Sequence, residues 1–74
     1  MSTTIAGTVA TVHRRTNKLG ALWAEVQLRD RTTVLVFPKA YSQHQHLLVE
    51  GAAVEITGRH DGQHLFAHQI AARR

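Results

Sequence analysis

The sequence predicts an all-β protein, a small barrel of five short strands with one short helix between the third and fourth strands. Three observations predict this fold. β-Branched and other apolar residues recur in five short segments, mostly at alternate positions. One apolar stripe with helical spacing follows Pro38, and Asp61-Gly62 is a typical hairpin turn. Because 74 residues can bury one small core, we expect a single domain over residues 1–74, frayed at residues 73–74.

The first strand is expected over residues 3–15, which are rich in Thr, Val and Ile. Gly7 lies within this segment and indicates a bulge or a bend, because glycine weakens a regular strand. Residues 16–20 then form a turn.

The second strand is expected over residues 22–30, where the alternation is clear. Ala24, Val26 and Leu28 share one face, and this small aliphatic face belongs to the core. The opposite face therefore carries Trp23, Glu25, Gln27 and Arg29. The single tryptophan of the chain is predicted to point away from the core.

The third strand and the helix follow a tight connection at residues 30–32. Residues 33–37 are nearly continuously apolar, which is typical of a strand covered on both sides, so we expect Phe37 in the core. Pro38 favours a helix start, and Gly51 is well placed to end a three-turn helix. Its apolar stripe consists of Ala40, Tyr41, His44, Leu47 and Leu48.

The last two strands are expected over residues 52–59 and 63–71, joined by the Asp61-Gly62 turn. Val54 and Ile56 point inward in the first of them. Three strands, a helix and two strands in about 70 residues is the order of the OB-fold. That fold is a Greek-key barrel that binds oligonucleotides on its second and third strands and the adjoining loops.

Five pieces of the sequence carry a closer resemblance, in this order: "IAGTVATVHRRTNKLG", "VQLRD", "VLVFPKAY", "LLVEGAAVEITGRHDG" and "LFAHQI". The chain resembles the OB domain near the carboxyl end of bacterial DNA polymerase III alpha subunits, within the wider tRNA-anticodon-type OB family. The resemblance covers nearly the whole chain. It implies an OB-fold, a nucleic-acid ligand and a role near DNA replication.

Two features depart from the family pattern. The connection between the second and third strands is a few residues shorter, and Glu25 occupies a position that is usually apolar. An anion on a binding face would repel phosphate. We therefore expect Glu25 to pair with Arg29 or Lys18, or the nucleic-acid backbone to pass elsewhere.

The positive charge is concentrated in the first half of the chain. The net charge is +4, and residues 1–39 hold six cations against two anions, whereas residues 40–74 hold three of each. A one-sided basic surface favours a polyanionic partner, nucleic acid first.

The candidate nucleic-acid-binding residues are of two kinds, because single strands are held by cations along their phosphates and by flat side chains under their bases. For phosphate we expect Arg14, Arg15 and Lys18 at the first strand's end, with Arg29 and Arg59 as further candidates. Trp23 is the stacking candidate, and Gln27 on the same face could hold phosphate or a base edge. On the last strand the His64 imidazole could bind phosphate. By resemblance to the family, Phe66 is expected in the core, with a base contact as the alternative.

Catalysis and metal binding find little support in the sequence. The chain has no cysteine, and its five carboxylates are scattered. Six histidines suggest a metal site, but residues four apart on a strand are about 13 Å apart. We expect no enzyme activity, no metal and no cofactor. No segment is long and apolar enough to span a membrane, and no signal peptide is apparent, so we expect a cytoplasmic, nucleoid-associated protein.

Three hypotheses for function stay open. The first is a module that binds single-stranded DNA with little sequence preference in replication, recombination or repair. The second is a docking module for replication proteins, and the third is binding of RNA rather than DNA. The chain is either a stand-alone protein, which its start at Met1 and its end soon after the last strand suit, or a piece of a polymerase. If a stand-alone protein forms a homo-oligomer, a dimer is expected.

Overall fold

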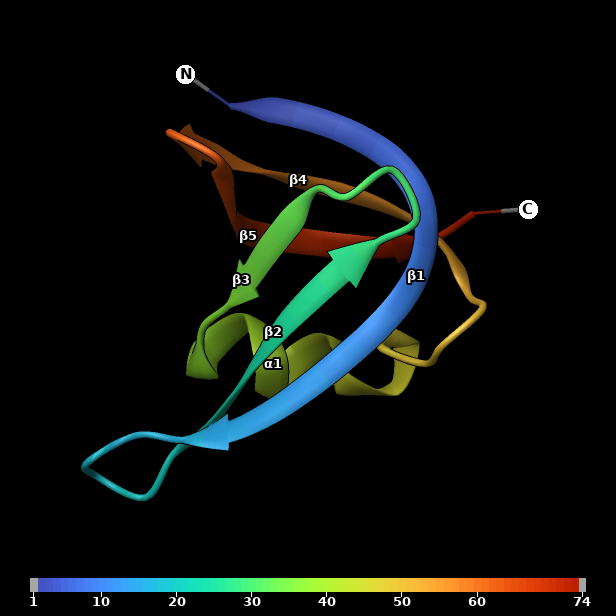
Figure 1. The fold of residues 1–74 in the computed structure, drawn as a ribbon. Coiled ribbons are helices and arrows are strands. Elements are labelled where there is room, and N and C mark those ends of the chain that lie inside the picture. The colour runs from blue at the N-terminus through green and yellow to red at the C-terminus, as the bar shows by residue number, and fades with distance from the viewer. Residues whose placement is uncertain (1, 74) are drawn as a thin grey trace.

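The computed structural model describes residues 2–73 and shows a closed five-stranded barrel with one short helical segment (Figure 1). The strand order is β1-β2-β3-β5-β4. All pairs are antiparallel except β3 and β5, which run parallel. The elements are β1 (Thr3–Thr16), β2 (Leu22–Leu28), β3 (Thr33–Val36), α1 (Pro38–His44), a 3-10 turn (Gln45–Leu47), β4 (Ala53–Asp61) and β5 (His64–Ala72). The predicted fold class and element order are confirmed.

Strand β1 closes the barrel because it pairs with two partners. Its first half, through Thr8, pairs with β4, and its second half, from Val9, pairs with β2. Figure 1 shows β1 curving around the other strands. Gly7 lies just before the change of partner, and a bulge follows between Val9 and Thr11, as expected of a strand that must bend.

Strands β2 and β3 form a hairpin in which Ala24 lies opposite Val36, and Val26 opposite Val34. All four side chains are fully buried. In the tight connection Asp30 Oδ1 accepts a hydrogen bond from the Thr32 N–H at 3.0 Å, and this bonding lowers the pKa of Asp30.

The helical segment covers one end of the barrel (Figure 1). The predicted three-turn helix is shorter in the structure: α1 ends at His44, whose φ of −126° is not helical, and a 3-10 turn continues to Leu47. Ala40 and Tyr41 are buried, and Leu48 just after the turn is fully buried. No helix within residues 2–73 is long and apolar enough to cross a membrane.

The hairpin of β4 and β5 turns at Gly62, whose φ of 64° lies in the left-handed region that glycine tolerates. The two strands approach closely at Gly58, beside a bulge: Thr57 pairs with Gln69, but Gly58 pairs with Ala67. A Cβ atom on Gly58 would overlap the carbonyl oxygen of Phe66. The absent side chain is therefore what permits this pairing. At the end of β5, the Arg73 N–H donates to the Ala53 carbonyl at 2.9 Å, and Arg74 lies outside the described residues.

One cluster of buried aliphatic side chains fills the barrel. Its largest members that are fully excluded from solvent are Leu28, Leu48, Ile56 and Leu65, with five valines between them. The interior holds small and medium aliphatic side chains, with Tyr41 at the helical end. Trp23, Phe37 and Phe66 are not among the buried residues of this core.

We predict that Gly58→Ala lowers the free energy of unfolding by about 3 kcal/mol, because the new methyl group would push β4 away from the Phe66 backbone. Urea unfolding followed by Trp23 fluorescence measures the effect. The control is Gly7→Ala, whose Cβ would meet no backbone atom and only the end of the Leu28 side chain at 3.1 Å, and we expect a loss below about 1 kcal/mol. Equal stabilities for the two variants would refute this role of Gly58.

Candidate nucleic-acid interface

Three aromatic side chains lie in contact on the outside of the barrel. Trp23 comes from β2, Phe37 follows β3 directly, and Phe66 comes from β5. The ring centroids of Trp23 and Phe37 are 6.1 Å apart, at an interplanar angle of 64°. Those of Phe37 and Phe66 are 5.4 Å apart, at 31°. We call these three side chains the aromatic ridge.

The strand register explains why the ridge faces outward. Ala24 and Val36 are lateral partners and both point into the barrel, so the residues before Ala24 and after Val36 point out. Leu65 likewise points inward, and Phe66 is turned outward. Three chain segments thus present their aromatic residues on one face.

Phe37 corrects the sequence prediction, which placed it in the core. Its side chain is 48% exposed, because Val34 and Val36 already occupy the inward positions of β3. The core assignment of Phe66 was also wrong: its side chain is only partly buried, and it packs against Phe37 outside the barrel. The alternation Thr33, Leu35, Phe37 was the signal for an outward Phe37, but the continuous apolar run obscured it.

Residues that are lateral partners on neighbouring strands form a row across all five strands, and Phe66 of the ridge belongs to this row. From β1 to β4 the row consists of His13, Glu25, Leu35, Phe66 and Arg59. Arg59 is exposed and lies directly beside Phe66 on the neighbouring strand. The structure therefore brings Arg59 to the ridge, although it lies 36 positions after Trp23 in the sequence.

Gln27 and His64 lie in the next row, on either side of Thr33. Both side chains are exposed. Asp61 is the lateral partner of His64, so an anion ends this row. Both candidates therefore lie on the same face as the ridge, one row beyond Leu35 and Phe66.

Glu25 forms an ion pair with Arg15, whose Nη2 lies 3.7 Å from Glu25 Oε1. The predicted pairing with Arg29 or Lys18 was wrong. Arg15 is the lateral partner of Trp23 on β1, so its guanidinium group can reach across to the carboxylate two residues along β2. The anion on this face is thus partly neutralised, although the pair is largely exposed and contributes little to stability.

Arg14 faces a different way from Arg15. Its Nε donates to the Tyr41 hydroxyl at 3.1 Å, and its Nη2 donates to the Leu48 carbonyl at 3.3 Å. These bonds tie the end of β1 to the helical segment. Of the three basic residues expected at this end, Arg15 lies on the face of the ridge and Lys18 in the exposed turn beyond it, whereas Arg14 is engaged elsewhere.

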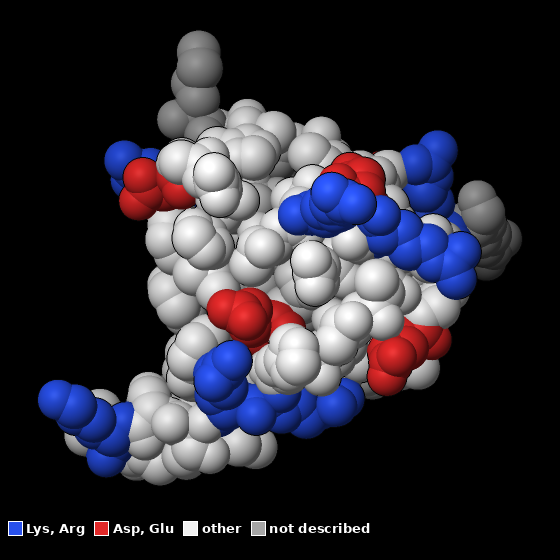
Figure 2. Space-filling view, in the orientation of Figure 1, with Lys and Arg blue, Asp and Glu red and all other residues white. Residues whose placement is uncertain are grey.

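The cations of this face are grouped. Figure 2 shows Lys and Arg side chains near the end of the β1–β2 hairpin and, on the other side of a mostly uncharged surface, near the β2–β3 connection. Arg29 lies just beyond β2 in that connection, and its backbone N–H donates to the Thr8 carbonyl at 2.9 Å. A strand that passes between the groups would meet cations on both sides.

The histidines do not gather into a metal site. Within residues 2–73 there is no group of three or more His, Cys, Asp or Glu side chains that could hold a metal ion. His64 and His68 are both exposed on β5. His64 pairs with Asp61 on β4, whereas the bulge leaves His68 without a lateral partner.

Comparisons with known proteins show what this barrel is similar to. A DNA polymerase III subunit alpha of Saccharopolyspora erythraea is 43% identical over 58 residues, which are 74% of this chain. That of Mycobacterium tuberculosis is 38% identical over 58 residues. That of Mycobacterium leprae is 36% identical over 73 residues, or 89% of this chain. No family model matches the chain.

The matched segment is a small part of these relatives, 5% of the Saccharopolyspora erythraea subunit and 6% of the Mycobacterium leprae subunit. Its five-stranded barrel with a helical segment after the third strand fits an OB-fold. The chain is therefore homologous to a short segment of bacterial DNA polymerase III alpha subunits, and it resembles the OB domain near their carboxyl end.

Proposed function

We propose that this chain is a non-catalytic module that binds single-stranded DNA with little sequence preference, on the face that carries the aromatic ridge. The observation that carries the proposal is the ridge itself, in which Phe37 contacts both Trp23 and Phe66 outside the core. Bases of any kind can stack on such rings. The homology to polymerase alpha subunits supports a setting in DNA replication, and recombination and repair are related settings.

The ridge is better explained by a ligand than by folding. Phe37 is 48% exposed, whereas the barrel core is complete without any of the three rings. Partly exposed aromatic side chains in a row offer flat faces to unpaired bases. Bases stacked there would lie between β1 and β4, with Arg15 on one side and Arg59 on the other.

The charges around the ridge suit a phosphate backbone. Four exposed cations lie at or near this face. Arg15 and Arg59 are beside the ridge, Lys18 is in the β1–β2 turn, and Arg29 is in the β2–β3 connection. Glu25 opposes them, but its pairing with Arg15 reduces the repulsion of phosphate. Few direct phosphate contacts are available, so binding should be moderate in strength and sensitive to salt.

A second candidate function is docking to a replication protein. Leu19 at the tip of the β1–β2 turn is 93% exposed, and Leu22 is 50% exposed at the start of β2. Two exposed leucines close together in the chain give this end of the hairpin an apolar surface that a protein partner could cover. If they serve docking, Leu19→Ser should leave oligonucleotide binding unchanged and abolish binding to purified polymerase partners.

Binding of a labelled oligo-dT of about a dozen nucleotides, followed by fluorescence anisotropy, tests the proposal. We expect Phe37→Ala to weaken binding by about 1–3 kcal/mol, because a stacking surface is lost. Val49→Ala is the matched control: Val49 is 55% exposed and lies with Val12 and Arg14 away from the ridge. Failure of the wild-type protein to bind at low salt would refute the proposed function. An unlabelled oligo-U competitor compares RNA with DNA.

The salt dependence of the same binding separates the two adjacent arginines. Each lost phosphate contact reduces the slope of log affinity against log salt by about 0.7 for a single strand. We expect this reduction for Arg15→Ala and not for Arg14→Ala, because Arg14 is bonded to Tyr41 and Leu48. Circular dichroism checks that both variants are folded. An unchanged slope for Arg15→Ala would place the phosphates elsewhere.

The neutral substitution Glu25→Gln tests the effect of the anion on this face. It removes the negative charge and frees Arg15, so we expect tighter binding at low salt. The difference from the wild type should shrink as salt is raised. Weaker binding by Glu25→Gln would show that the carboxylate itself contacts the ligand.

A further inference from the structure

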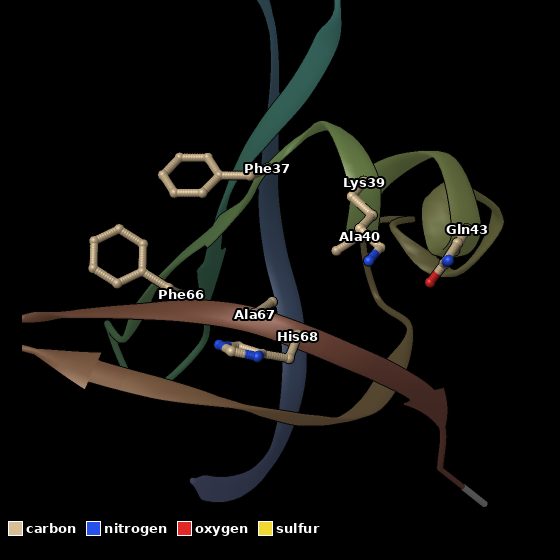
Figure 3. A pocket seen from close by; sticks show the side chains of 7 residues that line it. All are labelled: Phe37, Lys39, Ala40, Gln43, Phe66, Ala67 and His68. Carbon is tan, nitrogen blue, oxygen red and sulfur yellow. The ribbon is translucent and has the colours of Figure 1, made fainter. Parts of the chain in front are cut away.

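A cleft of about 250 Å³ lies between α1 and β5, directly beside the aromatic ridge (Figure 3). Phe37 and Phe66, two of the three ridge residues, are also part of its lining. Trp23 is not, so the cleft begins at the end of the ridge that is farther from β2. A ligand on the ridge can therefore continue into the cleft without leaving the protein surface.

The cleft exists because small residues meet at its floor. Ala40 on α1 is 7% exposed and Ala67 on β5 is 9% exposed, and neither side chain extends far enough to fill the space. The β5 bulge adds to this effect. Gly58 pairs with Ala67 and Thr57 with Gln69, which leaves His68 without a lateral partner on β4. A bulge redirects side chains, and here it brings His68 into the lining of the cleft.

The polar groups of the cleft suit a phosphorylated, hydrogen-bonding ligand. Lys39 and Gln43 extend from α1, and His68 extends from β5 (Figure 3). None of the described residues that line the cleft is an Asp or a Glu. No side-chain hydrogen bond or ion pair within residues 2–73 uses these three side chains. They are free to bind a ligand.

We propose that this cleft is a nucleotide subsite, which receives one nucleotide of a single strand of DNA beyond the bases stacked on the ridge. The ammonium group of Lys39 binds the phosphate. The amide of Gln43 offers a donor and an acceptor to the edge of the base. The base itself lies over Ala40 and Ala67, against the ring of Phe37 or Phe66. This inference rests on the proposed function, because the strand must first lie on the ridge.

The chemistry favours a nucleotide over an acidic peptide. A carboxylate could pair with Lys39, but it would make no use of two aromatic rings and a side-chain amide in the same cleft. A nucleotide uses all three kinds of group, since it combines a flat base, polar base edges and a phosphate. The contact with the ridge also supplies the path by which the neighbouring nucleotides arrive.

Affinities for a series of oligo-dT strands from about four to about twelve nucleotides test the subsite. In the wild type, shortening the strand that just fills the site by one nucleotide should weaken binding about fivefold, because that nucleotide loses its contacts with Lys39 and Gln43 together with its stacking. In Lys39→Ala/Gln43→Ala the same shortening should change the affinity less than twofold. On strands too short to reach the cleft, this variant and the wild type should bind alike.

The matched control is Gln45→Ala, which removes an exposed glutamine that lines a different groove with Leu22 and Pro38. This control should keep the full length dependence. Nitrogen-15 NMR adds a second readout: oligo-dT should shift the side-chain amide of Gln43 and leave that of Gln45 in place.

Three results would overturn the subsite, and they differ from failure of the proposed function. The first is tight binding of oligo-dT with the same length dependence in the wild type and in Lys39→Ala/Gln43→Ala. This result leaves the ridge as the binding site and refutes the subsite in the cleft. The same holds if the Gln43 amide does not shift on binding. If thymidine monophosphate alone shifts that amide and oligo-dT does not, the cleft takes free nucleotides and the strand proposal is wrong. Absence of any binding of oligo-dT would instead refute the proposed function.

Discussion

The closure of five short strands into one narrow barrel is the constraint on which the rest of the structure depends. The space between the strands holds aliphatic side chains of modest size, among them Val26, Val34 and Leu65 from three neighbouring strands. Because successive strand residues alternate, filling the inward positions fixes which residues point out. Trp23, Phe37 and Phe66 occupy such outward positions, and the lateral order of β2, β3 and β5 brings their rings into contact. The outward position of the three rings is thus a consequence of barrel packing, and their exposure is what leaves them free for a ligand.

The close pairing of β4 with β5 also shapes the cleft. Gly58 permits close contact with the backbone at Phe66, and the bulge that follows redirects His68. On the other side of β5, Ala40 and Ala67 keep α1 from filling the space beside Phe66. The same strand therefore supports a ring of the ridge and one wall of the cleft. Arg59 reaches Phe66 through the same pairing, which explains how a residue late in the chain joins cations from its first half.

Much of the fold could be predicted from the sequence, because alternation and turn chemistry are local signals. They gave the five strands, the outward Trp23 and the hairpin at Gly62. The site was predicted less well, since its contacts depend on how distant segments meet. Phe37 was assigned to the core because its strand is nearly continuously apolar, and Arg14 was grouped with Arg15 because the two are adjacent. The ion pair of Glu25 with Arg15 depends on side-chain conformation across two strands. The cleft depends on how α1 packs against β5. Neither can be predicted from a local sequence pattern.

The central claim is that bases stack on the ridge, and Trp23 fluorescence tests it most directly because this is the single tryptophan of the chain. Titration with unlabelled oligo-dT should quench the emission, over the same concentration range as the anisotropy change of labelled strand. Quenching should persist in Val49→Ala, whose substitution lies away from the ridge. If anisotropy shows saturable binding while Trp23 emission stays unchanged, the strand binds elsewhere on the barrel and the account of this face is contradicted.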